Sequence, residues 1–212
     1  MIFSNDPNFI YLDTPKCASR SMATHLTTYY GAAWNGMGRH RPRFPKSFLG
    51  HFVFSTVRNP YSRAVSCWYE ILNRNPYCGF WRTALGLEGL DCGSFWRWYE
   101  KMSFGPPNLP GDIVLVSQME FLSRATRWPD VVLRMESLDA EAREKLPWWV
   151  DNGPIERIVN PQGNGIVAIP GYGDWREHMT DEIAVIVQEW AGDAFERFGY
   201  SRDWREGGGS CE

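Results

Sequence analysis

Residues 9–26 read FIYLDTPKCASRSMATHL, and this stretch decides which fold the rest of the chain is expected to adopt. Residues 8–13 are mostly apolar and rich in strand formers, so we expect a buried strand there. Apolar residues at helical spacing from Met22 to Tyr30 then predict a helix. Between the two lies a turn of small and polar residues that carries one lysine, Lys16. This order of strand, turn and helix is typical of an α/β fold.

The turn after residue 13 has the composition of an anion-binding site. A helix N-terminus presents unpaired backbone N–H groups and the positive end of the helix dipole. Small residues such as Cys17 and Ala18 let the backbone close around a group the size of a phosphate, and Lys16 adds a positive charge. Ser19 and Ser21 add hydroxyl donors. The turn is therefore predicted to cradle a phosphate, although it lacks the GxxxxGK[ST] pattern of a Walker A loop.

A second strand-to-helix crossing follows at residues 51–72. The segment HFVFSTVR (51–58) predicts a strand, because it is rich in Phe, Val and Thr. The segment NPYSRAVSCWYEIL (59–72) predicts a helix with Asn59 as its N-cap and Pro60 at its first position.

Arg58 ends this second predicted strand, at the edge where open α/β sheets collect their ligands. Ser66 lies about 9 Å further along the helix axis than Pro60, at 1.5 Å per residue. One anion can touch Arg58 and Ser66 together only if it lies beside the first two helical turns. The alternative is that Arg58 pairs with a surface carboxylate and that Ser66 only packs, and the residues alone do not decide between the two.

The remaining chain continues the alternation of strands and helices. Strand-like segments are expected within 112–122 and 130–138, helices over 93–103, 138–146 and 180–198, and a long functional loop over 151–174. Thr180 would cap the last helix and Gly199 would end it. The predicted fold class is therefore α/β, with three layers and a central, mainly parallel β-sheet flanked by helices. We expect a single domain over 1–205 and a disordered tail over 206–212.

Composition excludes several classes of protein. The chain has 212 residues, 43% of them hydrophobic, and no apolar run of about 18 residues that could span a membrane. Its N-terminus lacks the pattern of a secretory signal, so we expect a soluble, cytoplasmic protein. Five cysteines without CxxC spacing argue against a zinc site and favour reduced thiols.

One basic segment stands out against the net charge of −3. The segment GRHRPRFPKSF (38–48) places four basic residues around His40 and contains no acid. For a charge run alone, a solvated loop is the favoured interpretation. The chain also has 11 tryptophans, of which some belong in the core, while those in 95–102 and 147–150 could line a binding cleft.

Taken together, these stretches resemble the sulfotransferases that use 3′-phosphoadenosine 5′-phosphosulfate (PAPS). The segment TPKCASRSM (14–22) is similar to the 5′-phosphosulfate loop of that family, and VRNPYSRAVSCW (57–68) is similar to its 3′-phosphate strand and helix. Residues 121–141 and 174–201 are similar to a later strand and to the C-terminal helix of the family. The likeness is to the bacterial and carbohydrate-type branch, and it implies the P-loop NTPase-like sulfotransferase fold.

The resemblance implies roles for the residues of both motifs. Lys16 would contact the bridging oxygen between the sulfuryl group and the phosphate. Arg58 and Ser66 would hold the 3′-phosphate. The turn that wraps the 5′-phosphate would consist of Cys17, Ala18, Ser19, Arg20 and Ser21. Arg20 departs from the family, which has a small hydroxylic residue there, so its side chain must turn away or add a charge to the donor. The stretch 170–176 offers Tyr172, Gly173 or Arg176 as later contacts to the 3′-phosphate.

Transfer to a hydroxyl acceptor needs a general base, which is most often a histidine. His51 is excluded, because seven strand residues put it about 23 Å from the ligand end of its strand. His25 is expected to be a structural residue on the helix face that turns away from the core, if Met22 and Leu26 face the core. His178 is expected at the surface or as a cap. His40 is the predicted base, with a carboxylate such as Glu70 as the alternative.

The predicted function is a PAPS-dependent sulfotransferase that acts on a saccharide or small-molecule hydroxyl and releases 3′-phosphoadenosine 5′-phosphate (PAP). We expect no metal, because Lys16 and the helix N-terminus can offset the developing charge. Three alternatives stay open: a non-catalytic module for PAP or another nucleotide, a kinase-like phosphotransferase, and a nucleic-acid-binding protein. The kinase lacks visible Mg²⁺ ligands and a Walker lysine, and the net acidity weighs against nucleic acid. Only Lys16 speaks against a pure binding module.

Overall fold

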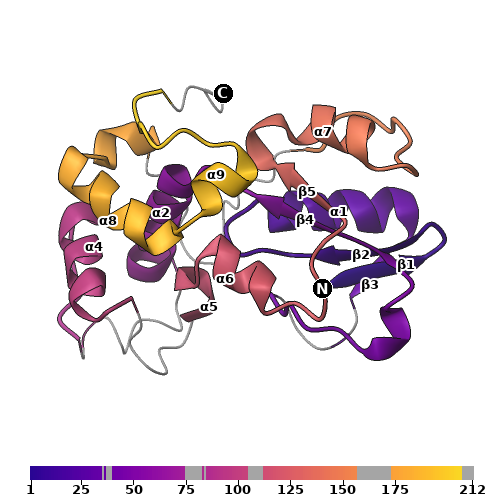
Figure 1. The fold of residues 1–212 in the computed structure, drawn as a ribbon, viewed down its shortest axis with the longest axis horizontal. Coiled ribbons are helices and arrows are strands. Elements are labelled where there is room, and N and C mark those ends of the chain that lie inside the picture. Colours follow the sequence, from indigo (N-terminus) through magenta and orange to yellow (C-terminus); the bar gives the residue numbers. More distant parts are fainter. Residues whose placement is uncertain are drawn as a thin grey trace. The chain divides into compact units, whose positions relative to one another are not determined.

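The computed structural model describes residues 1–34, 36, 40–74, 83, 85–104, 112–156 and 173–206. These residues form two compact units, each assembled from separate segments of the chain (Figure 1). Unit 1 contains residues 1–58 and 118–156, and unit 2 contains the described residues between 59 and 117 and from 173 onward. The single domain predicted over 1–205 stays a prediction. Residues 157–172 of the predicted loop and 207–212 of the predicted tail lie outside the described residues.

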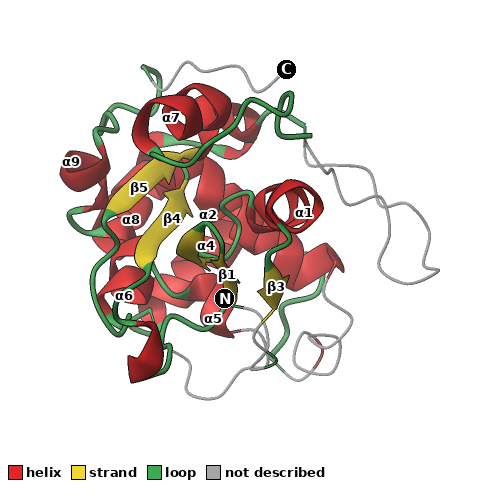
Figure 2. Ribbon diagram, turned by 90° about the vertical axis from the view of Figure 1, so that its right-hand side faces the viewer, coloured by secondary structure: helices red, strands yellow, loops and turns green. Residues whose placement is uncertain are grey.

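Unit 1 is built on a five-stranded sheet. Its strands are β1 (Ile2–Asn5), β2 (Asn8–Leu12), β3 (Ala33–Trp34), β4 (Phe52–Val57) and β5 (Val131–Arg134), in the spatial order β3-β1-β2-β4-β5. β2, β4 and β5 pair in parallel, as Figure 2 shows for β4 and β5, whereas β1 pairs antiparallel with both β2 and β3. The α/β class is confirmed, but the sheet is mixed where a mainly parallel one was predicted.

The two antiparallel strands, β1 and β3, are the ones that the sequence interpretation missed. β1 and β2 form a hairpin that turns at Asp6 and Pro7, and their register sets Ile2 opposite Tyr11. β3 has only two residues, both exposed, so no apolar pattern marks it. β2 and β4, in contrast, are almost entirely buried, which is typical of the parallel centre of an α/β sheet.

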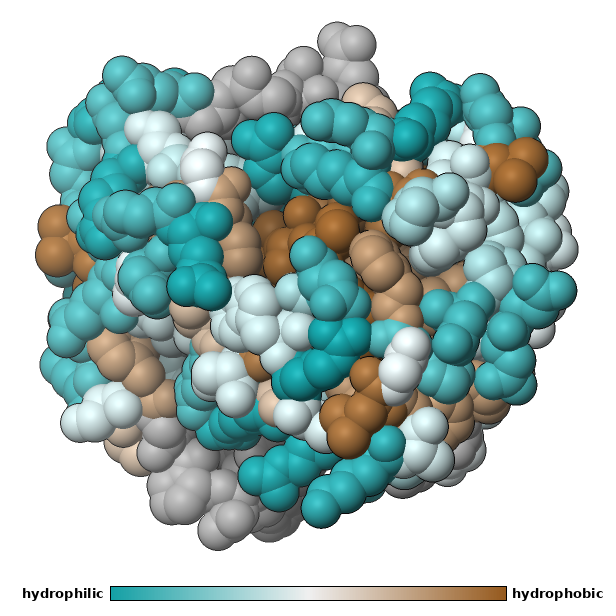
Figure 3. Space-filling view, turned by 45° about the vertical axis from the view of Figure 1, so that its right-hand side comes forward, coloured by the Kyte–Doolittle hydropathy of each residue, from teal (hydrophilic) through white to brown (hydrophobic). Residues whose placement is uncertain are grey.

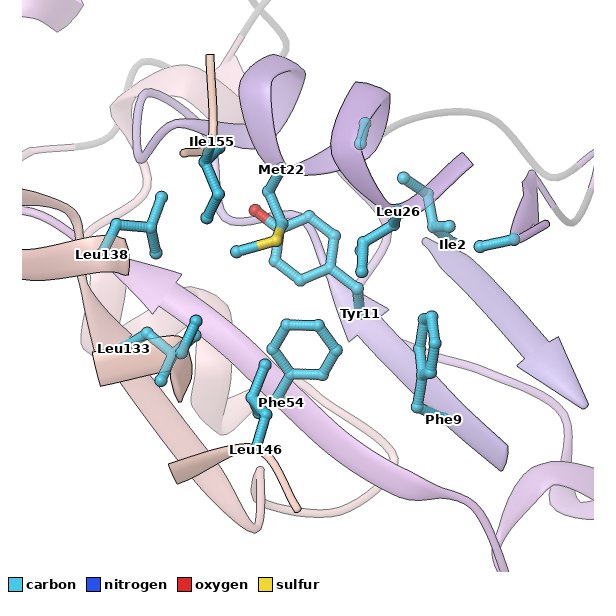
Figure 4. Close-up of a cluster of buried hydrophobic side chains, with 13 residues drawn as sticks. Ile2, Phe9, Tyr11, Met22, Leu26, Phe54, Leu133, Leu138, Leu146 and Ile155 are labelled. Atoms are coloured by element: carbon cyan, nitrogen blue, oxygen red, sulfur yellow. The ribbon is translucent and has the colours of Figure 1, made fainter. Parts of the chain in front are cut away.

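One face of the sheet is covered by α1 (Ser19–Tyr30) and α7 (Leu138–Lys145). Figure 4 shows Met22 and Leu26 of α1 close to the ring of Tyr11. Both α1 side chains are fully buried, so the predicted core face of this helix is confirmed at these positions. Tyr29 lies outside it, with 51% of its surface exposed. Burial of such apolar side chains supplies most of the favourable free energy of folding.

The opposite face of the sheet is covered in part by the basic segment. Phe44 is buried against Ile10 and Val53, and both its backbone groups bond to the Thr126 hydroxyl, at 2.8 Å and 2.9 Å. Arg41, Arg43 and Lys46, in contrast, are exposed. The segment is therefore anchored by the apolar side chains of Phe44 and Phe48, while Arg41, Arg43 and Lys46 face solvent.

Unit 2 is helical in the part of the chain that the structure describes. Its helices are α2 (Pro60–Tyr69), α4 (Cys92–Lys101), α5 (Asp112–Leu115), α8 (Asp181–Ala191) and α9 (Ala194–Phe198). Trp96 is fully buried and packs against Trp190, with ring centroids 4.8 Å apart. The buried guanidinium of Arg63 lies 5.0 Å from the Trp190 ring and donates to the Val114 and Val116 carbonyls.

Two of the predicted elements are wrong. Residues 112–122 form the short helices α5 and α6 (Gln118–Ser123) in place of a strand, because a short apolar run suits either element and its packing decides. The predicted helix over 180–198 is divided at Gly192, whose positive φ ends α8. Its Thr180 cap and its Gly199 end are confirmed.

Hydrophilic and hydrophobic residues are interspersed on the face of the chain that Figure 3 shows. The large hydrophobic residues with the greatest exposure, such as Val185 at 63% and Val150 at 59%, come from different segments. Within the described ranges, no helix is long and apolar enough to cross a membrane.

Candidate functional site

The turn between β2 and α1 has an unusual backbone. Lys16 and Ala18 both have positive φ, 64° and 59°, a conformation that is unfavourable for residues with a Cβ. α1 begins at Ser19, and its N-cap Ala18 offers no side chain to the first helical N–H groups. Backbone N–H groups in such turns and at helix N-termini attract anions.

Buried hydroxyl groups hold this turn on β4. The Thr56 hydroxyl donates to the Cys17 carbonyl and accepts a bond of 2.7 Å from the Tyr11 hydroxyl. The Thr14 hydroxyl donates to Ser55 at 2.8 Å, and Ser55 in turn donates to the backbone of β2. Burial raises the pKa of Tyr11, so its phenol stays a donor. Since β2 and β4 are parallel, these contacts gather at the carboxyl ends of both strands.

Gln118 joins the turn to the end of β4. Its side-chain oxygen accepts from the Arg58 backbone N–H at 2.7 Å, and its amide donates to the Arg58 carbonyl at 2.8 Å. The same oxygen lies 3.1 Å from the Cys17 thiol. Gln118 is buried, at the start of α6. The sequence interpretation missed it, because its segment was expected to be a strand and nothing local marks this residue.

The predicted phosphate-binding residues that follow Lys16 differ in their surroundings. The Ser19 hydroxyl donates to the Thr14 carbonyl at 2.6 Å, so its proton is used within the turn. Ser21 is buried as well, whereas Arg20 is exposed. Whether the exposed Arg20 side chain turns away from the donor or adds a charge to it stays a prediction.

His40 is tied to residue 13, directly before the turn. Its backbone N–H donates to Asp13 Oδ2 at 2.9 Å, and its ring Nδ1 lies 2.7 Å from the Asp13 carbonyl oxygen. His40 also has a positive φ of 55°. Asp13 is fully buried and forms an ion pair of 2.8 Å with the ammonium group of Met1. The structure therefore brings the predicted base to the turn that carries Lys16.

The other three histidines serve as packing or surface residues. His25 is buried and stacks on Trp149 with ring centroids 4.7 Å apart, so the prediction that it turns away from the core is wrong. His51 precedes β4, at the opposite end of this strand from Arg58, and its Nε2 lies 3.4 Å from Asn5. His178 lies beside Trp68 in unit 2.

The remaining candidates belong to unit 2. Ser66 is buried in α2, and the predicted N-cap is confirmed, because Asn59 accepts from the N–H groups of Tyr61 and Ser62. Since Arg58 belongs to unit 1, its joint action with Ser66 stays a prediction. Glu70 opens a π-helical turn, Glu70–Arg74, after α2.

The late segment is only partly described. Arg176 pairs with Asp174 at 3.2 Å and stacks on Trp175, and Gly173 has a φ of 73°. Tyr172 lies outside the described residues.

The tryptophans offered as cleft residues include two that pack in hydrophobic clusters. Trp96 is fully buried, and Trp148 stacks on Phe9 with centroids 4.3 Å apart. Among the described residues, no group of three or more His, Cys, Asp and Glu side chains is placed to hold a metal ion.

Comparisons with known proteins give no relative for this chain. A scan against protein-family models, a search of curated proteins and a search of solved structures each found no match.

Proposed function

We propose that this chain is a sulfotransferase that moves the sulfuryl group of PAPS to a hydroxyl acceptor and releases PAP. One observation carries the proposal: a turn with Lys16 and Ala18 in the left-handed region lies between a buried parallel strand and a helix whose N-cap has no capping side chain. Buried hydrogen bonds fix this turn to the strand that ends next to Arg58. Such a fixed cationic turn suits electrostatic stabilisation of charge that develops on a phosphate oxygen.

The proposal gives each cation its own task. Lys16 faces the bridging oxygen, where negative charge grows as the sulfuryl group departs. The N–H groups at the start of α1 hold the 5′-phosphate, with residues 17–21 around it. Arg58 holds the 3′-phosphate, and Ser66 of unit 2 is the proposed second contact. The reaction needs no metal in this scheme, because Lys16 and the helix N-terminus supply the positive charge.

His40 is the proposed general base. Its hydrogen bonds to Asp13 attach it to the residue three positions before Lys16. We propose a saccharide or other small hydroxyl compound as acceptor, and the cytoplasm as the place of the reaction. The exposed Arg41, Arg43 and Lys46 next to His40 favour an acceptor that carries negative charge.

Calorimetric titration tests donor binding directly. The purified chain is titrated with PAP, with ATP and with a short oligonucleotide, each once in the presence of a chelator and once with added Mg²⁺. We expect tight binding of PAP alone. Tight binding of ATP only with Mg²⁺ would favour the phosphotransferase, and tight binding of the oligonucleotide would favour a nucleic-acid function.

Transfer of ³⁵S from labelled PAPS to a panel of saccharides and phenols tests the chemistry. We expect label in at least one acceptor, and loss of this label in Lys16→Ala. Tight binding of PAP without any transfer of label, even to phenols, would refute the sulfotransferase activity and favour a non-catalytic module that binds PAP.

A further inference from the structure

We infer that Asp13 is a positioning residue, which fixes His40 so that Nδ1 carries the ring proton and Nε2 is the nitrogen that receives the proton of the acceptor. This inference rests on the proposed function for its catalytic meaning. Its geometric part, the tautomer of His40, stands independently of any activity.

The carboxylate of Asp13 is buried, and both of its oxygens have partners. A fully buried carboxylate is costly unless charges and hydrogen bonds compensate it. Oδ1 is compensated by the Met1 ammonium at 2.8 Å, and Oδ2 by the backbone N–H of His40 at 2.9 Å. Both oxygens are thus used, and one of them holds the main chain of the predicted base.

The backbone of His40 has an unfavourable conformation that the Asp13 carboxylate supports. A histidine with φ of 55° occupies a conformation that needs support from its surroundings. The bond from its N–H to Asp13 supplies this support, and it connects two residues that are 27 positions apart in the sequence. The position of His40 next to the turn therefore depends on the Asp13 carboxylate.

The surroundings of the His40 ring decide which of its nitrogens carries the proton. Nδ1 lies 2.7 Å from the Asp13 carbonyl oxygen and 3.3 Å from Oδ2 of the same residue. Both oxygens only accept hydrogen bonds, so Nδ1 must be the donor. In the neutral ring the lone pair then belongs to Nε2, and a carboxylate lies ready to stabilise the imidazolium.

Proton transfer follows from this arrangement. The acceptor O–H bond breaks, its proton moves to Nε2, and His40 becomes an imidazolium beside the Asp13 carboxylate. PAPS supplies the sulfuryl group: a bond forms between the acceptor oxygen and sulfur, while the bond from sulfur to the bridging oxygen breaks and leaves its electron pair on PAP. A carboxylate that orients a catalytic histidine and stabilises its imidazolium is an established catalytic device, and losing it lowers kcat strongly. Here the Asp13 carbonyl accepts from Nδ1, while the Asp13 carboxylate holds the His40 main chain.

The first experiment measures the tautomer. Long-range ¹H–¹⁵N spectra at about pH 8, where histidines are mainly neutral, report which ring nitrogen carries the proton. With four histidines in the chain, the signals of His40 are identified by their loss in His40→Gln. We expect the Nδ1–H form in the unaltered protein. In Asp13→Asn we expect a mixture, because the weaker side-chain bond to the His40 N–H lets the ring move away from the Asp13 carbonyl. An Nε2–H form in the unaltered protein would overturn the inference, even if Asp13→Asn failed to fold.

The second experiment separates positioning from folding. Asp13→Asn should lower kcat for an alcohol acceptor about 10²-fold and leave the KM for PAPS within about threefold. The acidic phenol p-nitrophenol needs no base, so its rate should fall less than tenfold. Equal losses for both acceptors would mean a structural role only and would overturn the inference.

The control is Asp130→Asn. The Asp130 carboxylate also accepts from a backbone N–H, that of Val53 at 2.7 Å, and also pairs with a cation, Arg127. The variant Asp130→Asn should change neither the tautomer of His40 nor the ratio of the rates with the alcohol acceptor and with p-nitrophenol. If the unaltered protein transfers no label at all, the proposed function fails while the spectra still decide the role of Asp13.

Discussion

The middle and the carboxyl end of the same two strands are held together by different forces. In the middle of β2 and β4, Phe9 and Phe54 meet edge to face with ring centroids 5.7 Å apart. At the carboxyl ends, Thr14, Ser55 and Thr56 form directional hydrogen bonds. Apolar contacts tolerate small shifts, whereas a buried polar group that loses its partner is costly. The apolar middle of the strands therefore maintains the fold, and their polar ends maintain the shape of the turn.

The largest effect is expected at the polar end, in Lys16→Ala. Removal of one preorganised cation should lower kcat about 10³-fold, because its charge is needed most in the transition state. The affinity for PAP, measured by calorimetry, should weaken less than tenfold. Lys101→Ala, at the exposed end of α4, is the control and should change neither value. An unchanged kcat in Lys16→Ala would refute the proposed chemistry.

Buried polar contacts should also stabilise the fold away from the turn, in a second polar cluster around Glu141 of α7. Burial alone would raise the pKa of Glu141, but hydrogen bonds from Lys145, Arg134 and Ser137 outweigh it and hold the pKa at about 2. Glu141→Gln should therefore lower the free energy of unfolding at pH 7 by on the order of 3 kcal/mol.

The pH dependence of this loss has a definite sign. Because the folded pKa of Glu141 lies below the ordinary value of 4.5, its stabilisation is complete above about pH 4.5. It declines as the pH falls toward 2, where the variant and the unaltered protein should become equally stable. Urea unfolding at pH 7 and near pH 3 measures this, with the exposed Glu144→Gln as control. A difference that does not shrink in acid would contradict the assignment.

The next largest losses of stability are expected for two substitutions in β4, one at its polar end and one in its apolar middle. Thr56→Val keeps the shape of the side chain but leaves the Cys17 carbonyl and the Tyr11 hydroxyl without their buried bond to residue 56, so a loss of about 2 kcal/mol is expected. Phe54→Leu should cost about 1 kcal/mol, because the core can close around a smaller apolar residue. Denaturant unfolding measures the free energy of unfolding of both variants. A larger loss in Phe54→Leu than in Thr56→Val would contradict this difference between the middle and the end of the strand.

The smallest effect concerns His25, a titratable residue in the apolar region. Burial lowers the pKa of His25, with Asp139 opposing the shift. Since the unfolded chain binds the proton more readily, the stability conferred by the neutral ring is lost as the pH falls below about 6.5. In His25→Phe the decline in melting temperature between about pH 7 and pH 5 should be smaller. Thr28→Val, on the exposed side of α1, should show the full decline.

The sequence predicts the elements that rest on local chemistry. β2, α1, β4 and α2 are marked by apolar runs, by the Asn59 cap and by the Pro60 start, and all four are present. The segment 112–122 could not be assigned, because its apolar run suits a strand or a helix and only its packing decides. β3 is too short to carry any pattern.

The candidate site likewise contains residues that the local sequence marks and residues that only distant contacts reveal. Lys16 and its small neighbours are visible in the sequence, because turn and helix start are adjacent there. The contributions of Gln118 and Asp13 depend on bonds across 60 and 27 positions, and no local signal announces such partners. His25 was assigned to the wrong face, because the tryptophan that covers it lies far along the chain.

The left-handed backbone at Lys16 and Ala18 also limits how this segment can be moved between proteins. Glycine adopts that conformation at lower cost, so residues 14–18 keep their shape through neighbours that they do not encode. A synthetic peptide of residues 9–26 would relax into other conformers, and a graft onto a foreign strand would need counterparts of Thr56 and Gln118 to come with it. The transferable module is therefore a set of positions from three separate stretches of chain.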